Sequence, residues 1–172
     1  MKGDIVNNCG NKMSSQKIKK ISELCRIVKG LKEEGKKTVF TNGCFDILHL
    51  GHIRYLEEAK RLGDCLVVAV NSDSSVRAIK GDRRPLVPEE ERAQVLAALS
   101  CVDYVVTFEE PDPGRIIGQL APDVLVKGGD WKIEEIVGRE TVEGAGGKVV
   151  RIKEVKGKAT SNLIELILKR YA

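Results

Sequence analysis

The stretch Thr41-Asn42-Gly43-Cys44-Phe45-Asp46-Ile47-Leu48-His49-Leu50-Gly51-His52 decides how this chain folds. It continues a short apolar run and opens an amphipathic one, so we predict a buried strand, a turn and the start of a helix. Its two histidines are the only ones in the chain, and they fall on the same side of that helix. A helix N-terminus offers free N–H groups and the positive end of a dipole, so this turn is typical of a loop that receives a polyphosphate.

Outward from this stretch, short apolar runs alternate with segments of helical period. The predicted strands cover residues 38–41, 65–70, 102–107, 124–127 and 148–152. The predicted helices cover residues 51–62, 88–99, 113–120, 134–143 and 161–171. This alternation indicates an α/β fold with a doubly wound, five-stranded parallel sheet of the Rossmann-like type. Such sheets bind ligands beyond the carboxyl ends of their strands.

Two segments precede the predicted sheet. Residues 1–14 are polar and irregular, and we expect a disordered tail there. Ser14-Ser15 then cap an amphipathic helix predicted over residues 15–36. This extra N-terminal helix either covers the sheet of its own chain or packs across a second copy, and the sequence leaves both placements open. Residues 37–172 are expected to form the ligand-binding domain.

Composition narrows the classes of function. The 172 residues include 29 Lys+Arg and 25 Asp+Glu, and the basic residues are spread along the chain. This distribution argues against a nucleic-acid partner and favours small anionic ligands. The five cysteines form no C-x-x-C pair, which is typical of a reduced, intracellular protein. Without a signal peptide or a run of about 20 apolar residues, we expect a cytoplasmic protein that does not engage a membrane.

Polar clusters follow the predicted strands at the end where a ligand would bind. Asn71-Ser72-Asp73 is explained equally by helix capping and by ligand contact. Lys80-Gly81-Asp82-Arg83-Arg84-Pro85 is a basic turn that forms either a solvated loop or an anion site. In Lys127-Gly128-Gly129-Asp130-Trp131, glycines permit close approach and the charged side chains can meet phosphate and sugar, with a structural turn as the alternative. Thr160-Ser161 cap the last helix or hold a phosphate.

Together these motifs resemble the cytidylyltransferase-like nucleotidyltransferases that carry an H-x-G-H signature, from about Lys37 to Leu168. Within that group the chain is most similar to the stand-alone D-glycero-β-D-manno-heptose 1-phosphate adenylyltransferases. The similarity rests on T-N-G-C-F-D-I-L-H-L-G-H, A-V-N-S-D, K-G-D-R-R-P, V-D-Y-V-V-T-F-E-E, P-D-V-L-V-K-G-G-D-W and I-V-G. It implies a nucleotidyltransferase domain over residues 37–172 that transfers AMP from ATP to heptose 1-phosphate, giving ADP-heptose and pyrophosphate for lipopolysaccharide synthesis.

The resemblance also implies which residues form the site. The catalytic residues, which stabilise charge at the attacked α-phosphorus, would be His49, His52 and Lys80. The nucleotide-binding residues would be Asn42, Gly43, Cys44, Phe45, His49, Gly51, His52, Lys127, Gly129, Asp130, Thr160 and Ser161. The residues of the substrate site would be Asp46, Asn71, Asp73, Lys80, Arg83 and Arg92, with Lys80 and Arg83 as cations for either the sugar phosphate or the triphosphate. Asp46 among them either contacts substrate or orients the loop.

Cofactor and partners follow from the same resemblance. Mg²⁺ is expected with ATP, held by phosphates and water because the sequence shows no dedicated set of metal ligands. A separate sugar kinase would supply the heptose 1-phosphate, and related enzymes are commonly homodimers. The chain departs from its relatives in one place, since many of them carry an arginine shortly before the final hydroxyl pair. Here Lys156 or Lys158 would replace it as a point charge.

Three other functions fit part of the pattern. A cytidylyltransferase acting on glycerol 3-phosphate or another small alcohol phosphate shares the fold and the histidine loop, and its choice of base separates it from an adenylyltransferase. A flavin-adenylating enzyme needs a broad apolar platform, which an aromatic content of 4% does not favour. A catalytically silent nucleotide-binding protein is disfavoured by the intact His49, Gly51 and His52.

Overall fold

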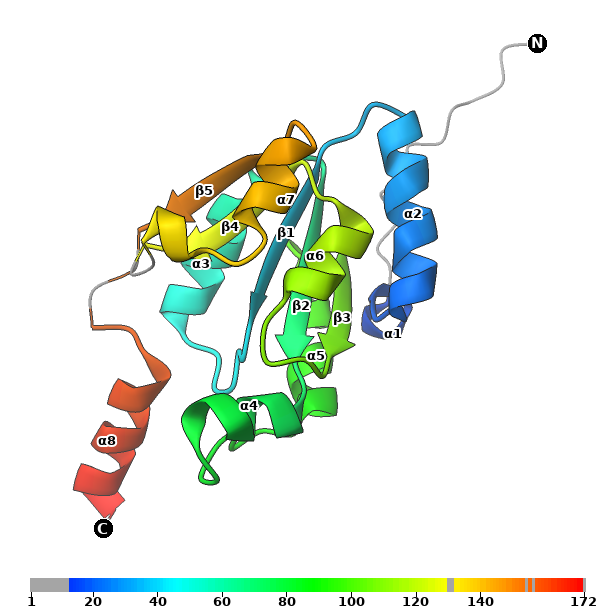
Figure 1. Ribbon diagram of the computed structural model, residues 1–172. Helices are drawn as coiled ribbons and strands as arrows, with labels where there is room; N and C mark the ends of the chain where they lie inside the picture. Colours follow the sequence, from blue (N-terminus) through cyan, green and yellow to red (C-terminus); the bar gives the residue numbers. More distant parts are fainter. Residues whose placement is uncertain (1–12, 130–131, 154, 156, 172) are drawn as a thin grey trace.

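The computed structural model describes residues 13–129, 132–153, 155 and 157–171, so nearly all of the predicted tail lies outside it. Five parallel strands form one sheet in the order β3-β2-β1-β4-β5 (Figure 1). The strands are β1 (Thr38–Gly43), β2 (Cys65–Asn71), β3 (Tyr104–Phe108), β4 (Val124–Gly128) and β5 (Lys148–Ile152). The predicted α/β class with a five-stranded parallel sheet is confirmed.

The central strands are apolar on both faces. All of β2 is buried, and in β1 the neighbours Val39 and Phe40 have no exposed surface although their side chains point to opposite faces. A parallel sheet of this composition is stable only when helices cover both sides. The alternation of the strands therefore divides the core into two apolar clusters, one for each face.

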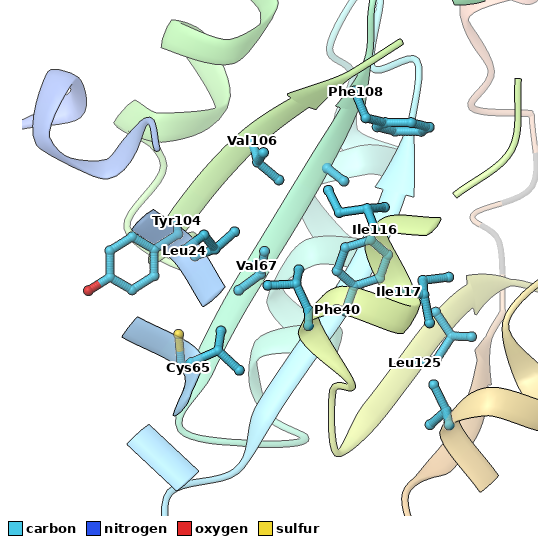
Figure 2. Close-up of a cluster of buried hydrophobic side chains, with 14 of the residues drawn as sticks. Leu24, Phe40, Cys65, Val67, Tyr104, Val106, Phe108, Ile116, Ile117 and Leu125 are labelled. Carbon is cyan, nitrogen blue, oxygen red and sulfur yellow. The ribbon is translucent and has the colours of Figure 1, made fainter. Parts of the chain in front are cut away.

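Helices lie over both faces of the sheet (Figure 1). One face carries α2 (Ile21–Glu33), α6 (Gly114–Leu120) and α7 (Arg139–Gly144), and the other carries α3 (Leu50–Lys60) and α5 (Glu89–Ala98). Figure 2 shows the first cluster, in which Leu24 and Ile117 from the helices join Phe40 and Val67 from the strands. Burial of each such side chain contributes about 1.5–3 kcal/mol, so these two layers fix the strand ends that carry the site.

The N-terminal segment forms two helices, α1 (Ser14–Lys17) and α2, in place of the single helix predicted over residues 15–36. Ile18 is extended between them and forms a parallel bridge to Val105 of the edge strand β3. Leu24 and Val28 of α2 are buried against the sheet of their own chain. Of the two placements left open by the sequence, the structure shows this one.

The helix predicted over residues 134–143 is also broken, into η1 (Ile133–Glu135) and α7. Gly138 stands between them with φ +87°, and a Cβ there would lie 2.6 Å from the side chain of Ile117. The glycine is therefore required at the break, although the apolar period continues across it. A further helix, α4 (Asp73–Lys80), was not among the predicted ranges, although helix capping was one of the two explanations of Asn71-Ser72-Asp73. Ser72 is its N-cap and accepts from the N–H of Ser75.

The order of the strands reverses at β1. The chain fills the sheet through β2 and β3 toward one edge and then places β4 and β5 on the other side of β1. In sheets of this topology the ligand binds at the carboxyl ends of the two strands where the direction changes, here β1 and β4. The last helix, α8 (Thr160–Tyr171), stands apart from the sheet on the side of these ends (Figure 1). No helix in the described ranges has both the length and the apolarity needed to cross a membrane.

Candidate active site

The loop after β1 brings both histidines to the start of α3. His49 is the N-cap of this helix, and its Nδ1 accepts a hydrogen bond of 3.1 Å from the N–H of Gly51. The rings of His49 and His52 stack with centroids 3.9 Å apart and planes at 23°. Phe45 meets the His52 ring edge-on, with centroids 5.3 Å apart. The two imidazoles thus form one unit, supported by an aromatic ring.

Both imidazoles are neutral at pH 7. Burial, followed by the neighbouring His49, lowers the pKa of His52 to about 4. Burial, followed by the ammonium of Lys158, holds the pKa of His49 below its ordinary value. Because Nδ1 of neutral His49 accepts from Gly51, its proton is on Nε2, which can donate to a ligand. Nδ1 of His52 is buried and has no hydrogen-bond partner within the described ranges.

Gly51 permits two close approaches at the helix start. A Cβ at this position would stand 2.9 Å from the His49 ring and 3.0 Å from the backbone oxygen of Lys158. The resemblance places Gly51 among the nucleotide-binding residues, where a missing side chain would make room for phosphate. In the structure an imidazole and a peptide carbonyl fill the space that a side chain would take, so the glycine is needed for the histidine pair itself.

Residues at the start of α8 lie against the histidine loop. Thr160 is half-buried and donates from Oγ1 to the backbone oxygen of Ile47 at 3.4 Å, whereas Ser161 is exposed. The Lys158 side chain is exposed, and its charge acts on His49. Lys156, the other candidate for the missing arginine, lies outside the described residues. Among the described residues, Lys158 is the cation whose charge acts on His49.

The turn between the strand and the histidines has an unusual backbone. Phe45 is buried and has φ +47°, a left-handed conformation that bulky residues rarely adopt. Such conformations cost about 1–3 kcal/mol and persist only where their surroundings hold them. Arg92 Nη1 donates to the backbone oxygen of Cys44, and the carboxylate of Asp46 accepts from the N–H groups of residues 86–87. The residues on both sides of Phe45 are thus held by other segments.

Asp46 is the buried member of an ion pair with Arg84. Its side chain has no exposed surface, and its Oδ2 accepts from Arg84 Nε at 2.5 Å. The N–H of Leu86 lies 2.9 Å from both carboxylate oxygens, and the N–H of Val87 donates to Oδ1 at 2.8 Å. Burial alone would raise the pKa of this carboxyl, but the two N–H groups and then Arg84 lower it below its ordinary value. Asp46 is therefore ionised and paired with donors of the protein.

Arg92, predicted for the substrate site, is 1% exposed. Its Nε donates to the backbone oxygen of Val87, its Nη1 to Cys44 and its Nη2 to the carboxylate of Asp73. These bonds give Arg92 a structural task at the turn, and Asp73 of the same predicted set is its partner. Asn71, also of that set, is buried and donates to a serine hydroxyl of α4.

Lys80 and Arg83 are exposed cations at the end of α4 and in the loop after it. Lys80 ends α4 and Arg83 follows in the loop, and neither makes a hydrogen bond or an ion pair with a described residue. Burial raises the pKa of the Cys44 thiol, while the charges of Lys80, Arg92 and Arg84 act against that rise. Lys80, Arg84 and Arg92 therefore all act on the turn at Cys44. Of these three, Lys80 has no bonded partner among the described residues, so its charge is available to an anion.

The ends of β1 and β4 are joined by a side-chain bond. The ammonium of the buried Lys127 donates to Oδ1 of Asn42, which brings two residues predicted for nucleotide binding together where the strand order reverses. Gly129 follows β4 and is exposed, and a Cβ there would stand 3.2 Å from the backbone oxygen of Ile152. Asp130, predicted beside it, lies outside the described residues.

Two contributors to this arrangement were missed by the sequence reasoning. The Tyr55 hydroxyl lies 2.7 Å from Thr41 Oγ1 and ties α3 to β1. Arg84 reaches Asp46 across 38 positions of sequence. The motif K-G-D-R-R-P signals a basic turn, but it does not show which of its two arginines faces inward.

Two other features bear on ligand binding, namely clusters of metal-ligating side chains and cavities. Among the side chains that the structure describes, no group of three His, Cys, Asp or Glu could hold a metal ion. A cavity of about 460 Å³ lies between η1 and α7, lined by residues 134–141 and 143. None of the predicted site residues lines it, so the histidine site is separate from this cavity.

The sequence of the chain is similar to those of known proteins. The profile of the Cytidylyltransferase-like family matches residues 40–164. The chain is similar to the bifunctional protein HldE of Citrifermentans bemidjiense, 54% identical over 162 residues that cover 94% of this chain and 33% of that protein. HldE of Geobacter sulfurreducens is 52% identical over 155 residues, covering 90% of this chain and 32% of the relative. The chain thus spans about a third of the length of the curated relatives it matches.

Two solved structures resemble the chain. The lipopolysaccharide core biosynthesis protein from Thermoplasma volcanium is 36% identical, with a TM-score of 0.61 over 71% of this chain and 100% of that one. A pantoate-beta-alanine ligase from Francisella tularensis is 16% identical, with a TM-score of 0.59 over 88% of this chain and 78% of the ligase. The second likeness concerns the fold alone.

Proposed function

The chain belongs to the cytidylyltransferase-like family, and on this basis we propose that it transfers AMP from ATP to D-glycero-β-D-manno-heptose 1-phosphate and releases pyrophosphate. The observation that carries the proposal is the stacked pair of His49 and His52 at the start of α3, where imidazoles and helix N–H groups can meet a triphosphate. The similarity to HldE and to a lipopolysaccharide core biosynthesis protein supports a sugar nucleotide as the product.

In the proposed reaction, an ionised oxygen of the sugar phosphate attacks the α-phosphorus of ATP. A new bond forms between this oxygen and the α-phosphorus, and the bond to the bridging oxygen of the departing pyrophosphate breaks in line with it. The nucleophile is already an anion at neutral pH, so no Ser, Cys or Lys nucleophile is needed. The protein contributes alignment and stabilises the charge on the non-bridging and leaving oxygens.

The histidines supply donors to that charge. His49 donates from Nε2, and His52 is stacked against it at the start of α3. A nearby triphosphate favours the protonated form of both rings, so binding raises both pKa values. Neutral rings in the free protein therefore become better donors as the substrate binds.

The remaining residues are assigned by the part of the two substrates that each would contact. Lys80 and Arg83 bind the sugar phosphate, and the segment 42–45 lies along the nucleotide. Two further sets of residues bind the nucleotide. Lys127, Gly129 and Asp130, at and after the end of β4, contact the nucleoside. Lys158, Thr160 and Ser161, before and at the start of α8, bind the outer phosphates. Mg²⁺ would accompany ATP and neutralise its phosphates, with hard oxygen ligands from the phosphates and water, because the described residues form no cluster of metal ligands.

Base choice separates this proposal from the cytidylyltransferase reading. The protein is mixed with heptose 1-phosphate and each of the four nucleoside triphosphates in turn, and pyrophosphate release is measured. We expect turnover with ATP. Turnover with CTP alone, or with glycerol 3-phosphate in place of the heptose phosphate, would replace this function by that of a cytidylyltransferase.

The proposal also includes a cellular compartment, an oligomeric state and a source of the sugar phosphate. The enzyme would work in the cytoplasm as a homodimer, on heptose 1-phosphate made by a separate sugar kinase. Light scattering tests the dimer directly, and the mass of a single chain in solution would remove it from the proposal.

A further inference from the structure

The carboxylate of Asp46 could in principle bind a ligand, but its described contacts are with donors of the protein itself. Four contacts from Arg84 Nε and the N–H groups of Leu86 and Val87 reach its two oxygens. A carboxylate offers about four lone-pair sites, so protein donors account for its capacity. The side chain is 0% exposed, which leaves it no surface for a sugar or a phosphate.

The segment that Asp46 holds is fixed from a second direction. Val87 gives its N–H to Asp46 and accepts at its backbone oxygen from Nε of the buried Arg92. The same Arg92 donates to the backbone oxygen of Cys44. The turn at residues 44–46 and the segment at residues 84–87 are therefore one bonded unit, although they come from different parts of the chain.

The cations assigned to the sugar phosphate depend on this unit for their position. Lys80 and Arg83 belong to the short connection between α4 and α5, and their side chains are exposed. The start of α4 is fixed because Ser72 Oγ accepts from the N–H of Ser75. The far end of the connection is fixed to the histidine loop by the contacts of residues 84–87 with Asp46 and by Arg92, which bonds Val87 and Cys44.

We propose that Asp46 is a positioning residue: with Arg84 it anchors the segment 81–87 to the histidine loop, and so sets the distance between the sugar-phosphate cations and the reacting phosphorus. The inference rests on the proposed function for the identity of the sugar phosphate. The anchor itself concerns only contacts within this chain.

Kinetics of matched variants test the proposal. Asp46→Asn removes the negative charge and leaves one acceptor oxygen, which cannot serve Arg84 and Val87 together, and Arg84→Met removes the partner from the other side. We expect each to raise KM for the sugar phosphate about tenfold while KM for ATP stays within about a factor of two, because only the sugar-phosphate subsite moves relative to the histidines. The double variant should be no worse than the worse single variant, because both remove the same interaction.

Asp103→Asn is the matched control. Asp103 also accepts from a lysine and from a backbone N–H, those of Lys60 and Leu66, but at the amino end of β2, away from the site. We expect its kinetic constants to equal those of the parent chain. An equal rise in both KM values in Asp46→Asn, or a loss of kcat with KM unchanged, would overturn the positioning role.

Hydrogen exchange provides a test that needs no substrate. In Asp46→Asn the N–H groups of Leu86 and Val87 should exchange faster than in the parent chain, whereas those of β2 should not change. Unchanged exchange at both residues would overturn the anchor. If the parent chain made no ADP-heptose, the proposed function would be wrong. The exchange measurement would still show whether Asp46 anchors residues 86–87, because it needs no substrate.

Discussion

The histidine loop and helix α8 border the same site, but they are held in very different ways. Residues 44–46 of the loop are bonded to two other segments, and Phe45 is buried in a strained conformation. Helix α8 has no buried residue, and Leu166, Ile167 and Leu168 on it are 43%, 50% and 59% exposed. Its described link to the loop is the bond from Thr160 to Ile47.

This contrast matches the tasks proposed for the two regions. Charge stabilisation at the attacked phosphorus requires donors that do not move, because a displacement of about 1 Å can cost 10²-fold in rate. The outer phosphates leave as pyrophosphate, so the residues that hold them must also release them. A weakly anchored helix start suits that second task.

The largest effect is expected from the rigid region. His52→Ala removes a donor at the reacting centre and should reduce turnover by roughly 10²-fold or more. Its effect on the free energy of unfolding should be small, about 1 kcal/mol, because the side chain is only partly buried. Pyrophosphate release and thermal unfolding measure the two quantities. Arg54→Ala, an exposed position of the same helix, is the control, and turnover equal to that of the control would contradict the mechanism.

The pH dependence of stability tests whether both rings are neutral in the folded state. The unfolded chain binds protons at its histidines below a pH of about 6.5, whereas folded His52 does so only near pH 4. The free energy of unfolding should therefore fall as the pH is lowered through this window and be independent of these groups above it. Urea titrations of the parent chain and of His52→Gln provide the comparison, and the variant should lose less stability between pH 7 and pH 4.5. Equal losses would show that His52 is not buried as a neutral ring.

A smaller effect is expected where the weakly anchored helix start meets the histidine loop. Lys158→Met removes a partly screened charge, worth about 0.2–1 kcal/mol, so KM for ATP should rise by no more than about fivefold. The same change relieves repulsion of the His49 proton and should raise the pKa of His49. With only two histidines in the chain, NMR titration resolves both rings. Lys169→Met in the last turn of α8 is the control, and a His49 pKa that shifts equally in both variants would place Lys158 away from the ring.

The smallest effect is expected from the exposed face of α8. Ile167→Ala should change the free energy of unfolding by less than about 0.5 kcal/mol, whereas Leu56→Ala in α3 removes a fully buried side chain and should cost about 2–5 kcal/mol. Chemical denaturation measures both. A loss at Ile167 as large as that at Leu56 would mean that another surface covers α8 in solution.

The sequence predicted what depends on neighbours along the chain. Apolar runs and helical periods placed all five strands, and the pattern at His49 and His52 located the loop, because periodicity and helix-start chemistry are local properties. The same reasoning joined η1 and α7 into one helix, since an apolar period does not show that Gly138 must adopt a positive φ. It also omitted α4, because eight residues are too few for a helical period to be distinguished in the sequence.

The sequence by itself determined the class of fold, the place of the histidines and the kinds of side chain at each strand end. Only the tertiary structure decided how those side chains are used: Arg92 and Asp46 serve the turn, Lys127 joins two strands, and Lys158 reaches His49. The reason is physical. A charged residue is defined by the partner that compensates its burial, and these partners come from segments far apart in the sequence, which only the packing of the sheet brings together.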